Sequence, residues 1–243
     1  MNNAFYVALS RQNALFRNMS VVANNIANAN TTAFKAEKMI FTDLVKKAAA
    51  NQKIAFAHDV ATVRDMRPGE LITTGSDFDV AIDGKGFFVV KTDEGRRYTR
   101  LGNFAANNAG ALVTVDGDKV TGASGEPINI PENSTNISVR EDGMVQAFVN
   151  GLPEEVGRIG IVSFDDEKEL KAVGHGLYEG DGAKPAVEGS FRVVHRSLEQ
   201  SNVNSVNELT DMIEISRGVG STAKLIKDLH DLVRKSIEVI GKA

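Results

Sequence analysis

The residues of this chain that could carry out chemistry are few and far apart. The four histidines, His58, His175, His195 and His230, lack the HxxxH spacing with which two imidazoles on one helix face bind zinc. The chain contains no cysteine, which excludes thiolate nucleophiles, disulfides and zinc–thiolate sites. We therefore expect no metal site.

Motifs for nucleotide binding or catalysis are incomplete. Gly84-Lys85-Gly86 matches part of a phosphate-binding loop, but GxxxxGK[ST] is absent, and these glycines suit a hairpin turn. The acidic run Asp165-Asp166-Glu167 is interpreted as a loop, and no GxSxG elbow presents a nucleophilic serine. We expect no catalytic residue, no cofactor and no enzymatic activity.

Composition excludes two further classes of protein. The 243 residues are 25% charged and 42% hydrophobic, with a formal net charge of -4, which is typical of a globular protein and not of a basic nucleic-acid binder. No stretch approaches the ~20 apolar residues of a membrane span. The start has no basic leader before its apolar residues. We expect no nucleic-acid partner, no membrane insertion and no cleaved signal peptide.

Two segments have the apolar spacing of helices. Near the N-terminus the intervals are threes and fours through Phe5, Ala8, Gln12, Leu15, Met19, Val22, Ile26 and Ala29. Poor helix formers at 28–32 predict the end of that helix. Near the C-terminus the same alternation runs through Leu209, Met212, Ser216, Val219, Ala223, Ile226, His230, Val233, Ile237 and Ile240.

The C-terminal helix has a start signal and a length of its own. Ser205 and Glu208 fit a capping box, in which each side chain satisfies a free backbone N–H group. A helix over residues 206–241 would be roughly 50 Å long, which is typical of a coiled coil.

The middle of the chain has a different period. Phe78, Val80 and Ile82 alternate with polar or small residues, and turn pairs recur at 83–84, 116–117, 142–143 and 150–151. Residues 144–149 and 158–164 are predicted to be neighbouring strands. The pattern predicts an α+β fold: terminal helices that pair as a coiled coil, and an inserted β-rich domain of mainly antiparallel strands.

These patterns give four segments. Residues 1–35 are predicted to be an N-terminal helix of an axial core and 36–75 a connector with short extended pieces. Residues 76–198 are predicted to be a β-rich outer domain and 199–243 the C-terminal helix. Apolar stripes must be buried, so the helices either pair within one molecule or pair and also pack against other copies.

A cluster of asparagines favours the second alternative. Asn24, Asn25, Asn28 and Asn30 weaken a helix, but buried amides can set the register of packed helices. A fraying helix end explains Asn28 and Asn30 equally well. The predicted subunit-interface residues are Phe5, Leu15, Met19, Val22, Asn24, Asn25, Ile26, Asn28, Leu209, Met212, Val219, Ile226, Val233, Ile237 and Ile240.

Several of these segments resemble a known family. The sequence is similar to the signatures of flagellar rod, hook and hook-associated proteins at ANNIANANTTAFK (23–35), DVAIDGKGFFVV (79–90), YTRLGNF (98–104), GALVT (110–114), and SNVN (201–204) with LTDMIEISR (209–217). The five motifs occur in the family's order and span nearly the whole chain. Within the family, the short length implies a rod protein and not a hook protein. Segments 1–13 and 198–204 look most like the FlgF class of basal-body rod proteins, and the FlgG class is the runner-up.

The resemblance implies a structural subunit of the flagellar basal-body rod, in its proximal part, that polymerises through its terminal helices. It would form part of the axial drive shaft and export channel for bacterial motility. The implied partners are other rod subunits, neighbouring axial proteins, the type III export apparatus, and rod chaperones or a cap. The implied location is the periplasmic rod, reached without a cleaved signal peptide.

Some alternatives stay open. The chain could be a distal-rod or other axial subunit, or a surface β domain on a coiled-coil stalk that binds peptide or glycan. Two departures from the family also matter. Ala33 stands where the family usually has Gly, and a positive φ there would be strained by a Cβ atom. Gly218 and Gly220 interrupt the C-terminal helix and predict a bend or close packing.

Overall fold

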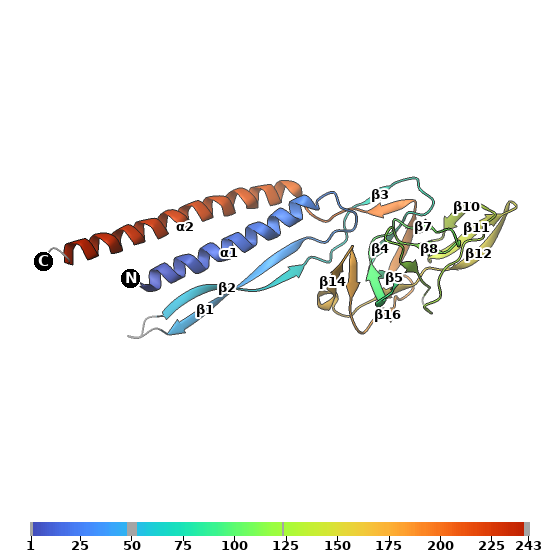
Figure 1. Ribbon diagram of the computed structural model, residues 1–243. Helices are drawn as coiled ribbons and strands as arrows, with labels where there is room; N and C mark the ends of the chain where they lie inside the picture. The colour runs from blue at the N-terminus through green and yellow to red at the C-terminus, as the bar shows by residue number, and fades with distance from the viewer. Residues whose placement is uncertain (1, 48–52, 123, 241–243) are drawn as a thin grey trace. The chain divides into compact units, whose positions relative to one another are not determined.

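The computed structural model describes residues 2–47, 53–122 and 124–240 (Figure 1). These residues separate into two compact units. We call Met1–Ala29, Ala36–Asp65 and Val203–Ala243 the helical unit. We call Asn30–Lys35 and Met66–Asn202 the β unit. The predicted α+β class, with terminal helices around an antiparallel β-rich region, is confirmed.

The helical unit contains two long helices and one hairpin. Helix α1 (Asn2–Ala27) packs along α2 (Ser205–Ile240). Strands β1 (Glu37–Lys47) and β2 (Lys53–Arg64) pair antiparallel and also contact α1. Figure 1 shows α1 between α2 and the hairpin. Helix α1 therefore supports both α2 and the β1–β2 hairpin.

The hairpin differs from the sequence expectation for this region. We expected a connector with short extended pieces over 36–75, but β1 and β2 have 11 and 12 residues. Alanine and lysine are frequent here and are depleted in strands, so local propensity did not favour them. An isolated hairpin is marginal in water, and packing on α1 supplies the missing support.

The start of α2 is also displaced from the expectation. The side-chain oxygen of Asn204 accepts hydrogen bonds from the backbone N–H groups of Val206 and Asn207, both at 3.1 Å. Asn204 therefore caps the helix, and the predicted Ser205–Glu208 capping box is wrong. The prediction failed because three residues that favour caps, Asn202, Asn204 and Ser205, lie close together in the sequence.

The two glycines of α2 leave the helix continuous. A Cβ atom on Gly218 would lie 3.4 Å from Leu15 Cδ1, whereas one on Gly220 would meet nothing within 4 Å. A Cβ atom on Gly218 would thus make only an ordinary contact with Leu15 of α1, so the structure does not require glycine at either position.

The β unit contains sixteen strands and one short 3₁₀ helix among its described residues. Its first strands are β3 (Leu71–Thr73), β4 (Val80–Gly84), β5 (Phe87–Thr92), β6 (Gly95–Thr99), β7 (Ala105–Ala106), β8 (Leu112–Val113), β9 (Lys119–Val120) and β10 (Ser134–Val139). The remaining elements are β11 (Met144–Val149), β12 (Leu152–Arg158), β13 (Ile161–Ser163), η1 (Glu167–Glu169), β14 (Lys171–Gly174), β15 (Leu177–Glu179), β16 (Lys184–Pro185), β17 (Phe191–His195) and β18 (Ser197–Glu199).

These strands form one large sheet and three small ones. The large sheet has nine strands, in the order β14-β15-β6-β5-β9-β8-β7, with β13 paired to β5 and β16 paired to β13. The small sheets are β10-β11-β12, β17-β4 and β18-β3. The prediction that residues 144–149 and 158–164 are neighbouring strands is wrong, because β11 pairs with β12 and β13 pairs with β5. Both segments read as strands, but pairing partners depend on the tertiary fold.

Strand β5 lies at the centre of the core and contributes to both hydrophobic clusters of the β unit. Its residues Phe87, Phe88, Val89 and Val90 are all buried. Phe88 and Val90 belong to one hydrophobic cluster, and Phe87 and Val89 belong to a second. A continuous apolar run in one strand is therefore explained by burial on both faces.

Candidate assembly surface

The packed face of the two helices follows the spacing of threes and fours. On α1 the predicted residue Val22 is buried, and Leu15, Met19 and Ile26 are half-buried. On α2 the predicted residues Met212, Val219 and Ile226 are half-buried. Leu15 lies against Gly218, which joins the two rows at that point. The structure thus brings these predicted residues together within one chain.

On α2, alternate residues of the predicted interface series are exposed, and the residue just before each of them is buried or half-buried instead. Leu209, Ser216, Ala223 and His230 are exposed, while Glu208, Ile215, Thr222 and Leu229 are buried or half-buried. Both series keep intervals of three and four, and both contain apolar residues. Periodicity alone could not separate them, because the choice depends on the direction from which α1 packs.

Asn25 joins three elements of the helical unit. It is 1% exposed. Its Nδ2 donates to the Glu37 carbonyl at 2.8 Å, and its Oδ1 accepts from the Glu37 N–H at 2.9 Å. The same Nδ2 donates to Glu208 Oε2 at 3.1 Å. One amide therefore holds α1 against the first residue of β1 and the first turn of α2.

The neighbouring asparagines have a different role. Asn24 is exposed, and Asn28 Nδ2 donates to its carbonyl and side-chain oxygens at 2.9 and 3.0 Å. These bonds lie at the last turn of α1, which ends at Ala27, just before the poor helix formers at 28–32 and earlier than the end of the predicted segment 1–35. Within the chain, Asn25 thus fixes the position of α1 relative to β1 and α2. Asn24 and Asn28 stabilise the C-terminal end of α1.

An ion pair between Glu37 and Arg64 extends this connection into the hairpin. Glu37, whose backbone Asn25 holds, accepts a hydrogen bond at 2.5 Å from Arg64 Nη2 on the paired strand. Sequence analysis did not single out Glu37 or Arg64, and it assigned Glu208 to a capping box and not to a contact with Asn25. Glu208 stands four residues before Met212, so the helical spacing contained that signal.

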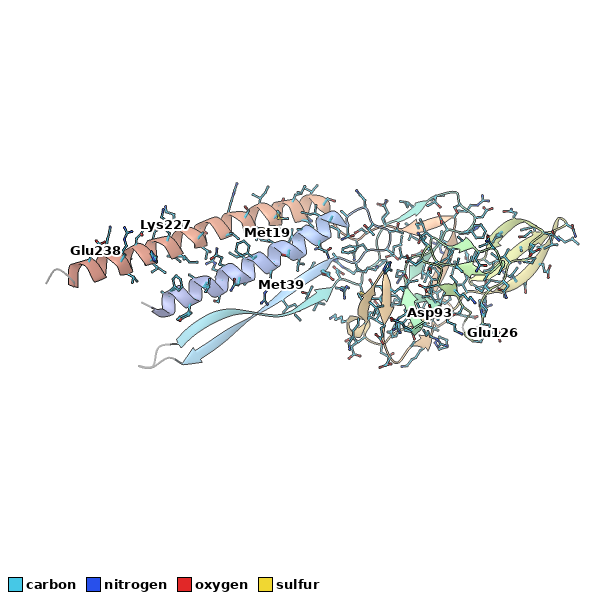
Figure 2. The ribbon with its side chains drawn as sticks, viewed as in Figure 1. Met19, Met39, Asp93, Glu126, Lys227 and Glu238 are labelled. Atoms are coloured by element: carbon cyan, nitrogen blue, oxygen red, sulfur yellow. The ribbon has the colours of Figure 1, made fainter. Side chains whose placement is uncertain are left out.

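Large apolar side chains remain exposed on the helical unit. On α1 these are Phe5, Tyr6, Leu9 and Phe16, and on α2 they are Val206, Leu209, Ile213, Leu225, Leu232 and Val233. Charged side chains such as Lys227 and Glu238 are also exposed on α2 (Figure 2). The side chains of the predicted residues Ile237 and Ile240 lie outside those that the structure describes.

The two exposed apolar sets follow helical rows. Phe5, Leu9 and Phe16 are spaced by four and seven, which places them on one side of α1. Val206, Leu209 and Ile213 are spaced by three and four, which places them on one side of α2. Contiguous exposed apolar rows mark surfaces that associate with other molecules.

Several of the residues considered for chemistry have structural roles in the part of the chain that the structure describes. Among the described residues, no group of three His, Cys, Asp or Glu side chains could hold a metal ion. Gly84 and Gly86 have φ values of 109° and 135°, as the hairpin interpretation requires. Asp166 accepts a hydrogen bond from the Lys168 N–H and caps η1. In the described chain, neither helix is long and apolar enough to cross a membrane.

Comparison with known families matches three parts of the chain. Residues 5–35 match the model described as flagella basal body rod protein. Residues 81–147 match the flagellar hook protein FlgE/F/G D1 domain, and residues 195–239 match the C-terminal region of flagellar basal body rod FlgEFG proteins. These parts include most of both helices and the strands around β5.

Individual relatives match over the full length. The flagellar basal-body rod protein FlgF of Caulobacter vibrioides is 40% identical over 248 residues, covering 100% of this chain and 99% of the relative. The FlgG protein of Bacillus subtilis is 31% identical over 268 residues, covering 98% and 99%. The FlgF protein of Mesorhizobium japonicum is 32% identical over 243 residues, covering 99% of both. The chain therefore belongs to the flagellar basal-body rod proteins, a structural family, in the group that contains FlgF and FlgG.

Proposed function

We propose that this protein polymerises through its helical unit into the flagellar basal-body rod, where it forms part of the axial drive shaft and export channel. The observation that carries the proposal is the row of exposed apolar side chains on α2, Val206, Leu209 and Ile213. Burying each such side chain contributes ~1.5–3 kcal/mol. A second copy of this chain, or a neighbouring axial protein of the same design, is the occupant of that row.

The helices depend on such neighbours for their stability. Ordering a residue costs ~1–2 kcal/mol, and an isolated helix is marginal in water. The buried side chains of α2 are few, and its apolar rows are largely uncovered within one chain. We therefore expect residues 1–29 and 205–240 to be protease-sensitive in the dilute monomer and protected in the polymer.

The finer assignment follows from the same family. We place the protein in the periplasmic, proximal part of the rod, exported by the type III apparatus without a cleaved signal peptide. Its partners there are other rod subunits, with rod chaperones or a cap during assembly. The FlgF relative at 40% identity supports the proximal assignment over the distal FlgG class.

The test is Leu209→Asp, because Leu209 is 51% exposed and its loss leaves the packing within one chain intact. We expect normal unfolding of the purified chain but no incorporation into basal bodies and no swimming. Asn207→Asp is the matched control, since it adds the same charge at an exposed position of the same turn and should leave swimming intact.

Two outcomes would contradict the proposal. Normal swimming of the Leu209→Asp strain would show that this row faces no neighbour. Normal swimming of a strain that lacks the whole gene, with peptide or glycan binding by the purified protein, would favour the surface-module alternative.

A further inference from the structure

Three charged side chains are buried together in the β unit. Lys35, Arg100 and Glu199 are 2%, 3% and 1% exposed. Lys35 Nζ donates to Glu199 Oε1 at 2.5 Å, and Arg100 Nη1 donates to Glu199 Oε2 at 3.3 Å. The Gly69 N–H also donates to Glu199 Oε1, at 3.0 Å. One carboxylate thus serves two cations and a backbone amide.

The contributors come from distant parts of the sequence. Lys35 lies before the β1–β2 hairpin, Gly69 follows that hairpin, and Glu199 ends β18. Lys35 Nζ donates in addition to the Arg67 carbonyl at 3.0 Å. The lysine therefore links the two points at which the chain leaves the β unit for the hairpin and returns from it.

Backbone hydrogen bonds hold the same segment. The Ala33 N–H donates to the Glu199 carbonyl at 2.8 Å, and the Asn202 N–H donates to the Phe34 carbonyl at 3.3 Å. Ala33 and Lys35 are both buried. Residues 30–35 consequently belong to the β unit, although helix α1 ends only two residues before them, at Ala27.

Close contacts and hydrogen bonds fix the residues around Glu199 in place. A Cβ atom on Gly69 would lie 2.0 Å from the Gln200 carbonyl oxygen, so only glycine permits this approach. Arg100 donates to the carbonyls of Ile82 and Gly84 at 3.0 and 2.7 Å, which fixes its guanidinium against β4. Lys35, Gly69 and Arg100 are all bonded to Glu199, so none of them can move without affecting the others.

The charges of the cluster do not balance. Two cations share one anion, and burial lowers the pKa of both Lys35 and Arg100, although Glu199 opposes that shift. Loss of Lys35 would leave the Arg100–Glu199 pair, whereas loss of the Glu199 charge would leave two buried cations without a counter-ion. A buried charge without a partner is strongly destabilising.

We propose that residues 30–35 are a docking segment that completes the β unit, with Lys35 inserted into a socket formed by Glu199, Arg67 and Gly69. The segment stays ordered when the helices are unfolded, because the hydrogen bonds of Ala33, Phe34 and Lys35 described above join residues of the β unit. Order in the monomer therefore begins at residue 30 and not at the start of β3. This inference is independent of whether the helices polymerise.

The test uses the full-length monomer at low concentration and hydrogen exchange resolved along the chain. We expect the amide of Ala33, which donates to the Glu199 carbonyl, to exchange as slowly as those of β5. Lys35→Met should speed exchange at Ala33 at least tenfold while β5 stays protected. Lys38→Met is the matched control, since Lys38 is 65% exposed and the change should leave exchange in the β unit unaltered.

Thermal unfolding provides a second measurement. Glu199→Gln should lower the Tm of the β unit by roughly 10 °C, and Lys35→Met should lower it by less than half as much. Rapid exchange at Ala33 in the unaltered chain would overturn the proposal. A larger fall in Tm for Lys35→Met than for Glu199→Gln would also overturn it, even if swimming is normal.

Discussion

The helical unit and the β unit bury their apolar residues in opposite ways. Among the described side chains, the buried hydrophobic residues of the helical unit are Ala8, Ala14, Val22, Ala36 and Ile215, three of which are alanine. The β unit buries large side chains, including Phe87, Phe88, Ile82 and Tyr98. The β unit therefore completes its own core, and the helical unit does not.

The exposed apolar residues show the same contrast. On the helical unit they form rows along α1 and α2, with Ile40 on the hairpin. On the β unit they are Ile72, Val115, Leu152, Val173 and Val187, which come from separate strands and loops. Isolated apolar residues on a surface are ordinary, whereas rows predict an interface. We therefore expect the β unit to fold alone and the helical unit to be completed by neighbouring subunits.

The largest expected effect tests the β core. Phe88→Ala should lower the free energy of unfolding by roughly 3–5 kcal/mol, because Phe88 is 0% exposed and packs against Phe104 with ring centroids 5.2 Å apart. Urea unfolding of the monomer measures the change. Phe16→Ala removes the same atoms from a side chain that is 47% exposed and should leave monomer stability unchanged. Equal losses in both variants would erase the contrast between the units.

The next effect tests register in the helical unit. Asn25→Ala should cost roughly 2–3 kcal/mol, because it leaves the backbone N–H and carbonyl of Glu37 without their partner. Hydrogen exchange of β1 in the polymerised protein measures this loss. Asn24→Ala is the control, since Asn24 is exposed, and it should change exchange little. Equal effects would mean that Asn25 does not set the register.

A smaller effect is expected for the two glycines of α2, and it tests how closely a neighbour approaches that helix. Gly220→Ala should stabilise the helix by about 1 kcal/mol, because the new Cβ atom meets nothing within 4 Å. Circular dichroism of the polymer during heating measures the gain. Gly218→Ala should give a similar gain, since contacts of 3.4 and 3.5 Å with Leu15 are ordinary. Loss of polymerisation in Gly220→Ala alone would instead identify Gly220 as a point of close approach by a neighbour.

The smallest effect concerns Ala33, which has a φ of 53°. The left-handed conformation costs an alanine roughly 1–2 kcal/mol, and Ala33→Gly would relieve it. The change also removes a buried methyl group worth ~0.8 kcal/mol and adds freedom to the unfolded chain. The free energy of unfolding, measured by thermal unfolding, should therefore change by less than about 1 kcal/mol. Ala81→Gly, in a buried strand with no such strain, should destabilise clearly more.

Some elements could be predicted from local sequence. The intervals of three and four identified both helices, and poor helix formers after Ala27 marked the end of α1. Turn pairs identified positions with positive φ, including Asn150 at 52° and Gly151 at 80°. Each of these features depends on residues that are close in the chain, so its signal lies within a short window.

Other elements could not be predicted because they depend on distant partners. The β1–β2 hairpin contains many residues that are poor strand formers and is supported by α1. The α2 residues that α1 covers, such as Ile215 and Thr222, differ by one position from the predicted Ser216 and Ala223. The same applies to Lys35 and Glu199, which are 164 residues apart and pair in the interior.

The sequence by itself determined the family, the two terminal helices, the antiparallel β region and the absence of cysteine chemistry. It also contained the asparagine cluster, without saying which asparagine matters. Only the tertiary structure decided that Asn25 is the one that joins α1, α2 and β1, and that Asn24 and Asn28 form the helix end. The physical reason is that a buried amide is valuable only where its partners lie, and those partners, Glu37 and Glu208, are brought to it by folding.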